Sequence, residues 1–138
     1  MEDIIQLLHR GGYSCVIKNN GKIKTFTGRG VKDLYELYNN DADFLDGAVV
    51  ADKVVGKAAA SLMILGKIAG LYTDLISIPA LNLLHDNGNI HVTFQKKTAV
   101  ILNRDQSDWC PLETLSYKEN SPENILPLIS GFMQKTGR

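Results

Sequence analysis

Three charged residues, Asp52, Lys53 and Lys57, stand close together in the segment VVADKVVGKAAA, which covers residues 49–60. The pattern predicts a buried strand that turns directly into a helix, with Asp52 as the N-cap of that helix. Lys53 and Lys57 are four residues apart, so both would lie on one helix face. Because a helix N-terminus carries partial positive charge, two lysines there oppose the local preference, and such conflicts mark functional or strained sites. Backbone N–H groups and two ammonium groups together predict a site for a phosphate or carboxylate.

Other interpretations of these lysines remain open. A lysine that is desolvated beside a second cation can act as a base or nucleophile, or both lysines can be solvated while Asp52 only caps the helix. The Gly56-Lys57 pair does not indicate a nucleotide-binding P-loop. That motif needs a glycine five residues before the Gly-Lys pair and a serine or threonine after it, where this chain has Ala51 and Ala58.

A second cluster of reactive side chains occupies the segment NRDQSDWCPLE, residues 103–113. Asn103 and Arg104 can clamp a carboxylate or phosphate, although an Arg104–Asp105 pair that ties down a turn is the alternative. A cation close to Cys110 would lower the pKa of its thiol and produce a nucleophilic thiolate. Glu113 could then orient a substrate or carry a proton. The competing interpretation is that Cys110 is a small, half-buried structural residue.

The spacing of apolar residues and turn signals predicts the elements that position these side chains. Helices are predicted at Glu2–Arg10, Val31–Tyr38, Lys53–Leu65, Pro79–His85 and from Ser121 onwards. Strands are predicted at Tyr13–Lys18, Lys22–Thr27, Asp46–Ala51, Leu71–Ser77, Ile90–Phe94 and Thr98–Leu102. This order predicts an α/β fold, a mixed sheet with helices on both faces. If the strands before Asp52 and Ser77 are parallel, two helix N-termini meet at one crevice beyond their carboxyl ends.

Composition narrows the classes of partner. The 138 residues predict a single domain, and 15 basic against 15 acidic residues give a net charge of zero, which argues against nucleic acid as the main partner. No stretch indicates a membrane span or a targeting signal, so we expect a cytoplasmic protein. The spacing of cysteines and histidines predicts no metal and no cofactor. Neutral charge and the apolar stretch 58–71 make a homo-oligomer plausible.

The remaining cysteine and the histidines are assigned no chemistry. Cys15 lies inside a predicted strand and is expected in the core, and a disulfide with the distant Cys110 is not expected in a reducing compartment. His9, His85 and His91 are scattered and are interpreted as structural or exposed.

Three separated blocks, VVADKVVGKAAA, SIPAL (residues 77–81) and NRDQSDWCPLE, resemble the uncharacterised family DUF1893, which is placed in the cytidine deaminase-like superfamily. The resemblance runs from about residue 13 to residue 133, the core of a single deaminase-like domain that covers residues 1–138. It implies a three-layer α/β/α sandwich with a central mixed sheet.

The same resemblance implies that the zinc site of the deaminases is missing. Those enzymes hold zinc with a His-x-Glu or Cys-x-Glu motif and a Pro-Cys-x-x-Cys motif. Here the first motif is replaced by Ala51-Asp52-Lys53, and Ala80 and Leu83 stand where the two cysteines would be. Neither residue can bind a metal, so the chain is expected to be zinc-independent.

Two functional hypotheses follow, with a structural homo-oligomer as a third. The first is a binding module for a small anionic molecule, such as a nucleotide, with the ligand-binding residues Lys53, Gly56, Lys57, Ser77, Asn103 and Arg104. The second is a metal-independent enzyme with the catalytic residues Cys110, Glu113 and Asp52. In that enzyme Cys110 is the nucleophile and one of the two carboxylates carries the proton.

Overall fold

The computed structural model describes residues 1–28, 31–87, 89–101 and 111–135. Its helices are α1 (Glu2–Gly11), α2 (Lys32–Asn40), α3 (Ala42–Leu45), α4 (Lys57–Gly66), α5 (Ile78–Asn87), α6 (Pro111–Ser116) and α7 (Pro122–Lys135). Its strands are β1 (Cys15–Asn19), β2 (Lys22–Phe26), β3 (Val49–Val55), β4 (Gly70–Ser77) and β5 (His91–Thr98). None of the helices in these ranges is both long and apolar enough to cross a membrane.

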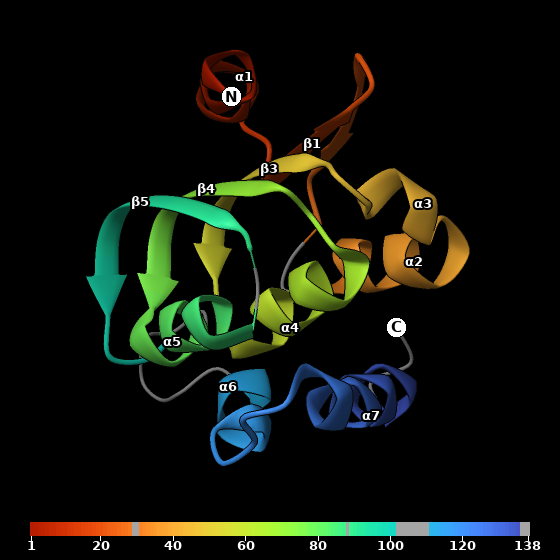
Figure 1. The fold of residues 1–138 in the computed structure, drawn as a ribbon, viewed down its shortest axis with the longest axis vertical. Coiled ribbons are helices and arrows are strands. Elements are labelled where there is room, and N and C mark those ends of the chain that lie inside the picture. The colour runs from red at the N-terminus through yellow and green to blue at the C-terminus, as the bar shows by residue number, and fades with distance from the viewer. Residues whose placement is uncertain (29–30, 88, 102–110, 136–138) are drawn as a thin grey trace.

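The five strands form one mixed sheet in the order β2-β1-β3-β4-β5 (Figure 1). Strand β1 is antiparallel to both β2 and β3, whereas β3, β4 and β5 run parallel to one another. The predicted hairpin is confirmed, since Asn20 and Gly21 both have positive φ angles, 52° and 79°, as the tightest hairpin turns require. The predicted α/β class, a mixed sheet with helices on both sides, is also confirmed.

Helix α4 lies at the centre of the molecule. It packs against α2, α5, α6 and α7, and Figure 1 shows α6 and α7 on the side of α4 that faces away from the sheet. All of its residues from 57 to 63 are buried. The opposite face of the sheet carries α1, whose Ile4 and Leu8 pack on Val16, Ala51 and Tyr72. The apolar surface of α4, which suggested self-association, therefore packs against other elements of the same chain.

The boundary between β3 and α4 differs from the prediction. Strand β3 continues to Val55, and the helix begins only at Lys57, with Gly56 in extended conformation as its N-cap. The β-branched residues Val54 and Val55 extend the strand because they pair with Leu75 and Ile76 of β4. Asp52 is therefore not the N-cap of this helix. Lys53 belongs to the strand and does not share a helix face with Lys57.

Three smaller differences concern two additional helices and the extent of one strand. A short helix, α3, follows α2 where the sequence predicted only a helix end. The first strand predicted after α5 runs on to Thr98, whereas residues 99–101 of the second predicted strand are not in a strand. Helix α6, which begins at Pro111, was not predicted. Proline is well tolerated in the first turn of a helix, and the buried Leu112 anchors α6 on the core.

Candidate functional site

The N-terminus of α4 holds a carboxylate from a distant part of the chain. Oε1 of Glu113 accepts a hydrogen bond from the backbone N–H of Lys57 at 2.7 Å, and Oε2 accepts one from Ile101 N–H at 3.3 Å. Glu113 is only 4 % exposed. Gly56 leaves room for it, since a Cβ there would lie 2.9 Å from Oε1. Glu113, rather than Asp52, thus supplies the negative charge that a helix N-terminus favours.

Lys57 is buried and its ammonium group is used within the chain. Nζ donates hydrogen bonds to the backbone oxygen of Tyr117 at 2.9 Å and to Oδ1 of Asn120 at 3.4 Å. Burial lowers the pKa of this ammonium group, and the charges of Glu113 and Glu119 partly oppose that shift. The interpretation of Lys57 as a solvated surface lysine is therefore wrong. Glu113 and Lys57 instead join α6 and the residues after it to the start of α4.

A row of polar side chains crosses the central strands on the sheet face that α4 covers. Cys15 of β1 pairs with Asp52 of β3, and Asp52 pairs with Thr73 of β4. Oδ1 of Asp52 accepts a hydrogen bond from Val54 N–H at 3.4 Å, and the Thr73 hydroxyl donates to the oxygen of Leu75 at 3.0 Å. The side chains of Asp52 and Thr73 therefore each bond to their own strand two residues further on, at the same level of the sheet.

The electrostatics of this row differ from those of a surface carboxylate. Desolvation raises the pKa of Asp52 to about 7, although hydrogen bonds from Val54, Lys53 and Cys15 act in the opposite direction. Burial, followed by the charges of Asp52 and Asp33, raises the pKa of the Cys15 thiol well above its usual value. Cys15 is a free, buried core cysteine, as predicted. Asp52 can exchange a proton near neutral pH, which suits a general acid or base.

The residues predicted to form one site are only partly brought together. Gly56, Lys57 and Glu113 are in contact, and the buried Ser77 lies at the end of the neighbouring strand, where its Oγ accepts a hydrogen bond from Ala80 N–H at 3.2 Å. Strand alternation places Lys53 on the sheet face opposite Asp52. Asn103, Arg104 and Cys110 lie outside the described residues.

The described residues show two surface hollows, neither of which is lined by the residues of this site. One hollow is lined by the hairpin and α3, including Lys22 and Phe44, and another lies between the end of α4 and the start of β5, including Lys67 and Ile90. In the part of the chain that the structure describes, no three His, Cys, Asp or Glu side chains gather in a way that could hold a metal ion.

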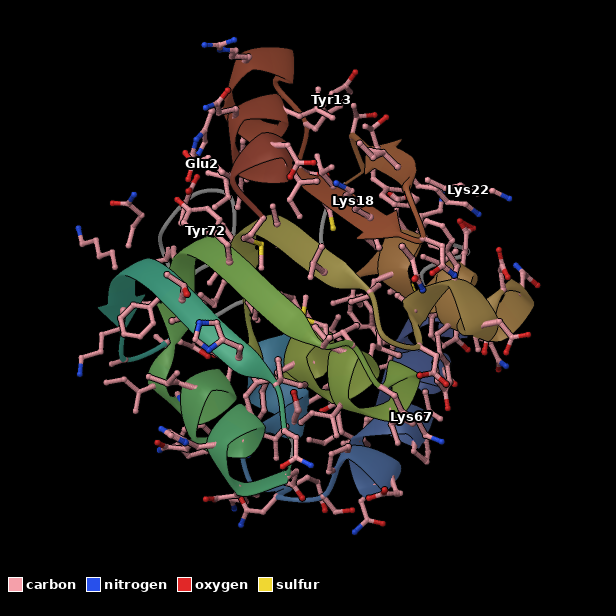
Figure 2. The ribbon with its side chains drawn as sticks, turned by 45° about the horizontal axis from the view of Figure 1, so that its top comes forward. Glu2, Tyr13, Lys18, Lys22, Lys67 and Tyr72 are labelled. Atoms are coloured by element: carbon pink, nitrogen blue, oxygen red, sulfur yellow. The ribbon has the colours of Figure 1, made fainter. Side chains whose placement is uncertain are left out.

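A polar cluster on the α1 face was not predicted. Nε2 of His9 lies 2.8 Å from Oδ1 of Asp74, and the hydroxyl of Tyr72 donates to the same oxygen at 2.5 Å. Figure 2 shows Tyr72 rising from β4 beside α1. Desolvation and the neighbouring Asp74 raise the pKa of Tyr72. No sequence signal could reveal the cluster, because His9 and Asp74 are 65 residues apart.

Comparisons with known proteins agree with this fold. A crystal structure of a DUF1893 family protein (TM1506) from Thermotoga maritima is similar over 94 % of this chain and 87 % of that one, with 27 % sequence identity and a TM-score of 0.87. No curated protein sequence matches this chain significantly. The family model for the domain of unknown function DUF1893 matches residues 3–133, nearly the whole chain. The chain therefore belongs to the DUF1893 family.

Proposed function

We propose that this domain binds a small molecule through a carboxylate or phosphate group at the N-terminus of α4. The observation that carries the proposal is the carboxylate of Glu113, which already lies 2.7 Å from Lys57 N–H. Backbone N–H groups and the helix dipole favour any anion at this position. The ligand anion would take the place of the Glu113 carboxylate.

The surroundings of this position support a ligand with more than one polar group. Ser77 ends β4 and directly precedes α5, which packs against α4, and the amide of Ile101 also points at the Glu113 carboxylate. Asn103 and Arg104 follow Ile101 in the chain and remain predicted ligand-binding residues. Lys53 has no part in this proposal, because strand alternation turns it to the other face of the sheet.

Chemical rescue tests the proposal. Glu113→Ala removes the internal carboxylate and leaves the N-terminus of α4 without its anion. Added formate or phosphate should then raise the denaturation midpoint of the variant, whereas the wild-type protein should respond little. Ligand present at 100 times its Kd would add about 2.7 kcal/mol.

The matched control is Glu36→Ala, which removes an exposed carboxylate from α2 with the same change in charge. If formate and phosphate stabilise both variants equally, or neither, Glu113 is only a structural cap. If rescue is specific, nucleotides and sugar phosphates should be screened against the wild-type protein by thermal shift. A ligand that competes with Glu113 should bind the alanine variant more tightly.

The second candidate function, a metal-independent enzyme, draws support from Asp52. A carboxyl group whose pKa is raised to about 7 lies in β3, the strand that leads into α4. In this hypothesis Cys110 is the nucleophile, and Asp52 or Glu113 carries the proton.

The pH dependence of Cys110 alkylation, followed by mass spectrometry, tests the enzyme hypothesis. Cys15 is the internal control, because its buried thiol should react slowly. An apparent pKa for Cys110 well below the free value of about 8.5 would identify a thiolate nucleophile. An unreactive thiol, or one that titrates at or above that value, would remove this hypothesis.

The relationship to the cytidine deaminase-like superfamily is also kept as a proposal. It would explain a central mixed sheet with two helix N-termini beside each other. The two positions where deaminases carry zinc-binding cysteines hold Ala80 and Leu83, which are buried in α5. On this proposal, the domain has kept a binding crevice and lost the zinc chemistry.

A further inference from the structure

Strand β5 forms an exposed edge of the sheet (Figure 1). It pairs with β4 on one side, and among the described residues no strand pairs with its other side. Of its eight residues, only Val92 and Thr98 are partly covered, and the other six are exposed. The opposite edge strand, β2, is shorter, with five residues. Its Lys24 forms a salt bridge with Asp41 at 3.2 Å and lies over the ring of Phe44.

The charge at the β5 edge is positive. Lys96 and Lys97 are exposed and have no salt bridge with any acidic side chain of the described residues. The acidic side chain of the adjacent strand β4, Asp74, already accepts a hydrogen bond from Tyr72 and contacts His9. Apolar surface lies near the lysines, since Phe94, two residues before Lys96, is 36 % exposed, and Val54, two strands away in the same row as Lys96, is 44 % exposed.

We propose that the β5 edge binds an extended acidic segment of a partner protein, which adds to the sheet as a further strand. Unpaired backbone groups of an edge strand supply the affinity in such complexes, and side chains of the edge supply the specificity. A second copy of this chain is a poor occupant, because β5 against β5 would bring four lysines into one interface. Edge lysines prevent self-pairing of this kind while they attract an acidic strand. The proposal uses none of the residues assigned to the site at α4.

Fluorescence polarisation with defined peptides tests the proposal on the full chain. The probe is a labelled eight-residue peptide, matched to the length of β5, that alternates glutamate with valine. A peptide with lysine in place of glutamate is the charge control. A third peptide carries N-methyl groups on alternate backbone amides, so that it keeps its charge but cannot complete a strand ladder. We expect the acidic peptide to bind about tenfold more tightly than the lysine peptide and to weaken with salt.

Two double variants locate the surface. Lys96→Glu with Lys97→Glu should reverse the preference in favour of the lysine peptide. Lys22→Glu with Lys32→Glu makes the same change in charge at exposed positions of the hairpin and α2, and it should leave the preference unchanged; Figure 2 shows Lys22 on the hairpin. Circular dichroism checks that both variants fold.

The proposal is overturned if all peptides bind alike, if none binds, or if the control variant also reverses the preference. Equal binding of the N-methylated peptide would exclude strand addition. A dimer in sedimentation that the Lys96 and Lys97 changes alter would mean that a second copy occupies the edge.

Discussion

The two faces of the sheet use polar side chains in opposite ways. On the face that α4 covers, Glu113 is buried and Asp52 is partly buried, and each carboxyl group accepts hydrogen bonds from backbone N–H groups. On the α1 face, Asp74 contacts His9 and Tyr72, but the side chains of His9 and Asp74 are 45 % and 33 % exposed. Similar groups and distances therefore occur in two very different dielectric environments.

This difference indicates that burial, more than geometry, determines how much each contact contributes to the free energy of unfolding. A buried polar group that loses its partner keeps its full desolvation cost, whereas an exposed group is solvated again by water. Exposed ion pairs contribute about 0–1 kcal/mol for the same reason. Function that depends on a perturbed carboxyl group is therefore expected on the α4 face.

The largest expected effect is the pH dependence that Asp52 imposes on stability. Its pKa is raised from 3.8 in the unfolded chain to about 7 in the folded protein, so the folded state binds more protons between these values. Stability should therefore fall as pH rises from about 4 to about 7, by about 4 kcal/mol for full burial and by less here, because Asp52 is partly exposed. Asp52→Asn should flatten this slope and be more stable than wild type at pH 8, as measured by urea denaturation at several pH values.

The matched control for this prediction is Asp43→Asn, the same change at an exposed carboxylate of α3. It should keep the wild-type slope. A slope that Asp52→Asn leaves unchanged would mean that the carboxyl group is solvated, and the contrast between the two faces would then be lost.

Removal of Glu113 should have the next largest effect. Glu113→Ala should lower the free energy of unfolding by about 3 kcal/mol, because one buried and one partly buried N–H group lose their acceptor. Glu113→Gln should cost less, since one amide oxygen can still accept the bond from Lys57. Urea denaturation measures both variants. A cost near zero for the alanine variant would show that water replaces the carboxylate and that Glu113 does not stabilise the packing of α6 against α4.

Gly56→Ala should cost about 1–2 kcal/mol by pushing the Glu113 carboxylate away from Lys57. The φ angle of Gly56 is −100°, so alanine itself is not strained there. A double-mutant cycle separates the causes: in a Glu113→Ala background the same change should cost almost nothing. An unchanged cost in that background would point to a local backbone effect instead.

The smallest effect is expected on the α1 face. His9→Ala should lower the free energy of unfolding by less than about 1 kcal/mol, because the contact with Asp74 is exposed. Its effect should also add to that of Glu113→Ala, since the two residues lie on opposite faces and share no partner. A loss comparable with that of Glu113→Ala would contradict the comparison of the two faces.

Local signals in the sequence predicted much of the fold. Asn20-Gly21 predicted the hairpin, the spacing of Ile4 and Leu8 predicted α1, and Pro122 predicted the start of α7. The prediction of Asp52 as an N-cap was wrong. It was made because an aspartate after an apolar run is a good N-cap in isolation. Pairing of Val54 and Val55 with β4 extended the strand instead, and that pairing depends on a different part of the chain.

The candidate site was predicted less well than the fold. Gly56, Lys57 and Glu113 were all identified, but in other roles, with Gly56 and Lys57 as ligand-binding residues and Glu113 as a proton carrier. The contact between Glu113 and Lys57 spans 56 residues, and the ammonium group turns to Tyr117 and Asn120. Asn103, Arg104 and Cys110 stay predictions, since they lie outside the described residues.

The sequence by itself determined the α/β class, the hairpin, most helices and the family, because these follow from periodicity, turn chemistry and motifs that are local in the chain. Only the tertiary structure decided which carboxylate caps α4, which lysine is buried, and that Asp52 lies between Cys15 and Thr73. The physical reason is that desolvation and hydrogen-bond partners depend on what packs around a side chain. For Glu113, Asp52 and His9, those neighbours come from residues far away in the sequence.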